Sequence, residues 1–64
     1  MNDERANLLS CATSMDDITK RITATADRLA EAGNDAVASD LYEVERALRN
    51  ANRRLARVVA SFRS

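Results

Sequence analysis

Acidic residues are the first candidates for chemistry in this 64-residue chain. Asp16 and Asp17 are neighbours, and Glu43 and Glu45 are separated by a single residue. General acid and base catalysis needs carboxylates that converge on a substrate, whereas side chains this close along a helix diverge. The chain also lacks histidine, the commonest general base. We therefore expect these carboxylates to be solvated and the protein not to be an enzyme.

Cys11, the only cysteine, is the second candidate for chemistry. No cysteine or histidine spacing suits zinc, no acidic loop suits calcium, and no glycine-rich loop suits a phosphate. We accordingly expect no cofactor, no metal ion and no small-molecule substrate. Free cysteine is commonly buried, so we expect Cys11 to be a small buried hydrophobe. The alternatives are a redox-sensitive thiol or a disulfide across a dimer axis.

The basic residues are concentrated at the end of the chain. Residues 1–45 carry ten acids and four bases, and residues 46–64 carry six arginines and no acid, although the formal net charge is zero. One helix face carries four of these arginines, namely Arg46, Arg49, Arg53 and Arg57. We expect this face to be solvated and neutralised within the protein, where it suits the negative end of a helix. The alternative is a binding site for an anionic partner formed by the same four arginines.

The element that would position these residues is a turn at Gly33, the only glycine in a chain without proline. Glycine suits the left-handed position just past a helix end, and Asn34 or Asp35 can cap the next helix. The pattern predicts one all-α domain over residues 1–64, an antiparallel two-helix hairpin with helices at about 3–32 and 35–62 and a turn at about 33–34. A competing helix start at Ser14 would leave residues 1–13 as a tail.

Two apolar stripes at heptad spacing support the hairpin. The first stripe consists of Leu8, Cys11, Met15, Ile18, Ile22, Thr25, Leu29 and Ala32. The second consists of Val37, Leu41, Val44, Leu48, Ala51, Leu55, Val58 and Phe62. Folding at Gly33 pairs their members in layers whose two residue numbers always sum to 69 or 70. We expect these two stripes to face each other.

A further stripe of small residues lies beside the first one and predicts self-association. A chain of this length gains only about 3–5 kcal/mol from its own core, so a second copy would stabilise it as a four-helix bundle. The expected homodimer interface consists of Leu9, Ala12, Thr19, Thr23, Ala26, Ala56 and Val59. Ala26→Arg is then expected to disperse the dimer. The rival is a hetero-complex in which another protein supplies the missing helices.

The composition also bears on location and source. No apolar run approaches the ~20 residues of a membrane span, and the N-terminus lacks the layout of a signal peptide. We expect a cytoplasmic protein that does not bind membranes. Arginine outnumbers lysine nine to one and alanine is common, which points to a GC-rich bacterial or phage genome.

Two heptad helices around a short turn resemble the plan of the Rop-type RNA-binding hairpin, which dimerises into a four-helix bundle. The resemblance is architectural, and no RNA-contacting residue carries over. Our leading hypothesis is a non-enzymatic protein–protein interaction module, a small self-associating hairpin acting as adaptor or regulator. The alternative is a small nucleic-acid-binding regulator that uses the arginine face of the second helix, a binding mode that salt would weaken steeply.

Overall fold

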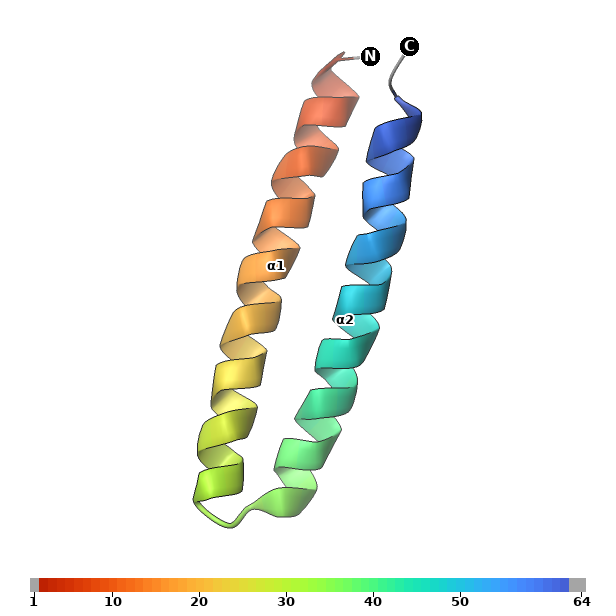
Figure 1. Ribbon diagram of the computed structural model, residues 1–64. Coiled ribbons are helices and arrows are strands. Elements are labelled where there is room, and N and C mark those ends of the chain that lie inside the picture. The colour runs from red at the N-terminus through yellow and green to blue at the C-terminus, as the bar shows by residue number, and fades with distance from the viewer. Residues whose placement is uncertain (1, 63–64) are drawn as a thin grey trace.

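The computed structural model describes residues 2–62 and consists of two antiparallel helices joined by a short turn (Figure 1). Helix α1 spans Asn2–Glu31 and helix α2 spans Asp35–Ser61. The Cα trace extends 50 × 14 × 9 Å, and the start of α1 and the end of α2 lie at the end of the rod opposite the turn (Figure 1). The expected helical hairpin is therefore confirmed. We refer to the two ends of the rod as the turn end and the open end.

The turn is built around Gly33, whose φ of 86° is in the left-handed region that glycine adopts without a steric cost. The Asn34 N–H donates to Leu29 O at 2.8 Å, and the Gly33 N–H donates to Ala30 O at 3.1 Å. This pair of bonds is the Schellman arrangement that ends helices. Asn34 is the N-cap of α2, but its side chain makes no capping bond, so the expected side-chain cap is wrong at that residue.

Helix α1 continues through Ser14 without a break, so residues 2–13 are helical rather than a tail. Asp3 and Glu4 lie in its first turn, where negative charge stabilises the positive helix end. Neither α1 nor α2, the two helices of the described range 2–62, has the length and hydropathy needed to cross a membrane.

Four small side chains form the buried part of the contact between α1 and α2. The exposed fractions are 2% for Thr19, 0% for Ala26, 2% for Ala38 and 6% for Val59. Thr19 tolerates this burial because its hydroxyl donates to Met15 O at 2.7 Å, one turn earlier in the same helix. The helices thus make their closest contact along small residues.

The structure corrects the expected packing of the two apolar stripes, because their members do not all face each other. Ile18, Val37, Val44 and Val58 are 46%, 45%, 42% and 47% exposed, and Cys11 is exposed too rather than buried. The distance between packed helix axes depends on side-chain size at the contact. Both helices are therefore rotated so that the four buried side chains meet at the centre of the contact, and Ile18, Val37, Val44 and Val58 lie along one open face. The other large members of the two stripes are half-buried between these regions, namely Leu8, Met15, Ile22, Leu29, Leu41, Leu48, Leu55 and Phe62.

Candidate interaction surfaces

One face of the hairpin carries four of the five large apolar side chains that are exposed within residues 3–62; the fifth, Leu9, lies elsewhere on α1. Ile18, Ile22 and Thr25 of α1 line an open groove together with Leu41 of α2 and Arg21. On α2, Val37, Val44, Ala51 and Val58 recur at seven-residue spacing and are all exposed. We define the apolar face as Cys11, Ile18 and Thr25 of α1 with Val37, Val44, Ala51 and Val58 of α2. It runs along the rod and joins both helices.

The residues expected to form the dimer interface divide into three groups in the structure. Thr19, Ala26 and Val59 are buried between α1 and α2, where Ala38 joins them. Ala12 and Thr23 are half-buried at the same contact, and Leu9 and Ala56 are exposed. Dimerisation itself stays a prediction, but three of these seven side chains are already enclosed within one chain. Leu9 and Ala56 remain open to a second copy.

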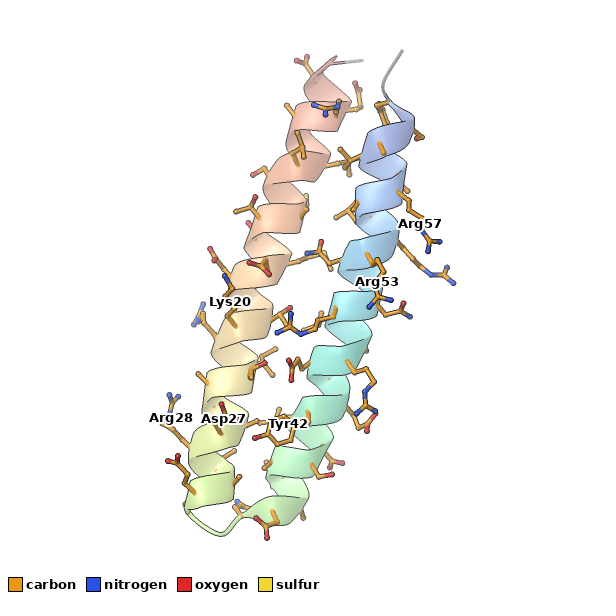
Figure 2. All side chains as sticks on the ribbon, in the orientation of Figure 1. Lys20, Asp27, Arg28, Tyr42, Arg53 and Arg57 are labelled. Carbon is orange, nitrogen blue, oxygen red and sulfur yellow. The ribbon has the colours of Figure 1, made fainter. Side chains whose placement is uncertain are left out.

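The four arginines expected to bind an anion lie on the flank of α2 away from the apolar face, and we call them the arginine flank. Arg46 donates two hydrogen bonds to the Glu43 carboxylate at 2.9 and 2.8 Å. Arg49 Nε donates to Glu45 at 2.8 Å. Within residues 2–62, Arg53 and Arg57 form no ion pair, and Arg57 points away from α1 (Figure 2). Half of this set is thus neutralised by carboxylates one turn earlier in α2.

Asn52 is a polar residue at the helix contact that sequence reasoning overlooked. Its Nδ2 donates to Ala12 O across the hairpin at 3.3 Å, and its buried Oδ1 has no hydrogen-bond partner in the structure. The signal in the sequence is heptad spacing, because residue 52 lies seven positions from Val59 and fourteen from Ala38, both of which are buried. A polar residue at such a position fixes the alignment of two helices at a cost in stability.

A second cross-helix hydrogen bond lies closer to the turn. The Tyr42 hydroxyl donates to Asp27 Oδ1 at 2.5 Å, and Figure 2 shows the two side chains directed toward each other. The bond to the Asp27 carboxylate is the main cause that raises the pKa of Tyr42, and slight desolvation adds to it. Residues 27 and 42 sum to 69, so this bond fixes the same alignment of α1 and α2 that the sequence predicted.

This bond predicts a measurable dependence of stability on alkaline pH. A raised pKa in the folded state means that folding favours the neutral phenol, so the stabilisation is complete below the unfolded pKa of about 10. It is then lost as pH rises through the folded-state pKa. Tyr42 is the only tyrosine and there is no tryptophan, so its near-ultraviolet absorbance reports the titration directly. We expect Tyr42 to titrate above the value for unfolded chain.

The control for that titration is Tyr42→Phe, which removes the hydroxyl and keeps the ring. Between pH 9 and pH 11, its free energy of unfolding is expected to fall less than that of the native chain. The difference between the two falls is the contribution of the hydrogen bond from Tyr42 to Asp27. Titration of native Tyr42 at the same pH as tyrosine in urea would mean that the bond to Asp27 does not form in solution.

Charge is divided along the rod. Residues 25–45, at the turn end, carry six acids and one base, a net charge of −5. Residues 3–24 and 46–62, at the open end, carry four acids and eight bases, a net charge of +4. The antiparallel fold places residues 46–62 beside the first part of α1, as the Asn52–Ala12 bond shows. The hairpin therefore has one acidic end and one basic end.

Residues 2–62 contain no group of three or more His, Cys, Asp or Glu side chains placed to hold a metal ion. Comparisons with protein-family models, with curated proteins and with solved structures gave no match to this chain.

Proposed function

We propose that this chain is a non-enzymatic protein–protein interaction module that self-associates through its apolar face and acts as an adaptor or regulator. The observation that carries the proposal is the exposure of Ile18, Val37, Val44 and Val58 along one side of a two-helix rod. Contiguous apolar surface of this kind is typical of sites that bind another protein. Covering it would complete the core that one hairpin lacks.

The accessible area of the chain supports this proposal quantitatively. The hairpin exposes 4827 Å² for a mass of 7.1 kDa. A compact monomer of this mass exposes about 4,100 Å², so the excess is about 700 Å². Stable protein interfaces cover about 800 Å² on each partner. The surplus surface of one hairpin is thus close to what one side of an interface covers.

The test is a charged substitution in the apolar face, Val44→Glu. Val44 is exposed in the single hairpin, so the variant is expected to remain helical. Burying its carboxylate in an interface is costly, so self-association should weaken by at least about tenfold. Sedimentation equilibrium gives the dissociation constant, and circular dichroism of the same samples gives the helicity.

The matched control is Asn50→Glu, which places the same new charge on an exposed position of α2 away from the apolar face. It should associate as the native chain does. Equal association of native chain and Val44→Glu would count against the apolar face as the interface.

The second candidate function is nucleic-acid binding by the arginine flank. The observation that favours it is the absence of an ion pair at Arg53 and Arg57 within residues 2–62. The carboxylates of Glu43 and Glu45 bonded to the other two arginines weigh against it. The affinity for phosphates would fall steeply with salt, whereas the affinity of association through the apolar face would fall less steeply.

A further inference from the structure

We propose that two copies of this chain pair antiparallel through their apolar faces, so that the turn end of each lies on the open end of the other. This inference rests on the proposed self-association and adds the orientation of the partner. In this proposal, the partner that binds the apolar face is a second copy of this chain. In this arrangement α1 packs on α1 of the second copy and α2 packs on α2.

The first argument is the charge of the two ends. The turn end carries −5 and the open end +4 among residues 3–62. Antiparallel pairing brings each acidic end onto a basic end, whereas parallel pairing brings together two ends whose net charges have the same sign. Like charges across an interface oppose association and opposite charges fix its orientation.

The second argument is a pair of charges on the edge of the apolar face. By helical spacing, Asp40 and Arg54 flank the stripe of Val37, Val44 and Val58 on its outer side. Both are exposed, and neither forms an ion pair within residues 2–62. They are fourteen positions apart, and residue 47 is the midpoint between them. When α2 packs antiparallel on α2 of the second copy with residue 47 at the two-fold axis, Asp40 of each copy faces Arg54 of the other. The dimer therefore contains this pair of opposite charges twice.

The apolar residues of α2 agree with this midpoint. Val37 pairs with Val58 and Val44 pairs with Ala51 when the helix is reversed about a point between residues 47 and 48. No bulky side chain of the stripe is then left without an apolar neighbour. The same reversal therefore satisfies the charges and the apolar side chains.

Helix α1 gives the same midpoint independently. Asp17 and Arg28 are exposed on its outer edge, and reversal about a point between residues 22 and 23 brings each onto the other in the second copy. Within one hairpin, the Tyr42–Asp27 bond shows that facing residues of α1 and α2 have numbers that sum to 69. Residue 22 of α1 therefore lies beside residue 47 of α2, so the midpoints of the two helices lie at the same level of the rod. One two-fold axis thus serves both helices.

The competing arrangement is a parallel dimer with both turns at the same end. There α1 would pack on α2 of the second copy, so Asp40 would meet Arg28 and Arg54 would meet Asp17. The two arrangements use the same four charges in different pairs. Exchanging the charges of Asp40 and Arg54 distinguishes them.

The experiment compares the dissociation constants of Asp40→Arg, Arg54→Asp and the double variant by sedimentation equilibrium near physiological salt. Each single change turns two attractive pairs per dimer into repulsive ones and should weaken the dimer by about tenfold. The double variant restores opposite charges in the antiparallel dimer and should return to within about threefold of the native value. In a parallel dimer, the double variant would be weaker than either single change.

Two controls isolate the effect of position from that of net charge. Glu31→Arg changes the charge of the turn end as Asp40→Arg does, and Arg57→Asp matches Arg54→Asp, but both residues lie away from the apolar face. Each should change the dissociation constant by less than about threefold, because exposed charges are screened beyond about 8 Å. Failure of the double variant to recover overturns the antiparallel arrangement, and a native chain that is monomeric at all concentrations does so too.

The proposed function is tested separately by Val44→Glu. If Val44→Glu dissociates the native assembly while the charge exchange gives no recovery, the apolar face stands as the interface and only the orientation is wrong. If Val44→Glu has no effect, the apolar face itself is not the interface and both proposals fail.

Discussion

We expect Ala26→Arg to unfold the hairpin rather than to separate a dimer. Ala26 is 0% exposed at the contact of α1 with α2, beside the buried Thr19 and Ala38. An arginine there cannot fit without pushing the helices apart or burying its charge, which costs about 3 kcal/mol or more. That is most of the roughly 3–5 kcal/mol that a core of this size supplies. Thermal unfolding followed by circular dichroism should show loss of the cooperative transition.

Ala24→Arg is the matched control for this change, because Ala24 lies in the same helix and is exposed. It should leave the unfolding midpoint nearly unchanged. The opposite result is equally clear. An Ala26→Arg chain that kept its helicity and melting temperature but became monomeric would return the stripe of small residues to the role of an interface between copies, as the sequence predicted.

The second large effect is a gain in stability on replacing Asn52 by leucine. Asn52 lies in the contact between the helices with a buried Oδ1 that has no partner, and such a group costs about 1–3 kcal/mol. Its Nδ2 bonds Ala12 O at 3.3 Å, a helix carbonyl that also accepts within α1. Asn52→Leu removes the unpaired oxygen and buries apolar surface, so the free energy of unfolding should rise by about 2 kcal/mol.

A gain of that size in a chain of this length corresponds to a rise of roughly 8–15 °C in the melting temperature. Asn50→Leu, at an exposed position of the same helix, should produce a much smaller change. A lower melting temperature for Asn52→Leu would mean that Oδ1 has a partner in solution, such as an ordered water, and that the amide stabilises the hairpin.

Much of the fold could be predicted from the sequence because two local signals agree. Gly33 supplies the left-handed residue that ends α1, and the heptad stripes on either side share one alignment. The Tyr42–Asp27 bond has the same residue sum as the predicted layers. Turn chemistry and periodicity thus give the hairpin and its alignment without any tertiary information.

The rotation of the helices could not be predicted in the same way. The stripe through Ile18 and the stripe through Thr19 are offset by one residue, and both repeat at heptad spacing. Periodicity alone therefore does not decide which of the two stripes faces the other helix. In the structure the contact is centred on Thr19, Ala26 and Ala38, whose small side chains allow the backbones to approach. The residues of the apolar face were therefore expected inside the hairpin, whereas Thr19, Ala26 and Val59 were expected at a contact between two copies.

The arginine flank shows a different reason for an incomplete prediction. Arg46 and Arg49 lie three and four residues after Glu43 and Glu45, a spacing that favours ion pairs on a helix. That spacing is visible in the sequence and agrees with the interpretation in which the arginine face is neutralised within the protein. The neutralised half of the flank was thus predictable in principle.

The opposite charges of the turn end and the open end also have a kinetic consequence. In the proposed antiparallel pair, fields from these charges would act before two copies touch, so they would orient the approaching hairpins and raise the rate of productive encounters. Apolar contact would then govern how slowly the proposed pair separates. Added salt should therefore slow association while leaving the lifetime of the assembled pair nearly unchanged. In a cell, the charge pattern would set how quickly copies find each other at low concentration, and the apolar face how long they stay together.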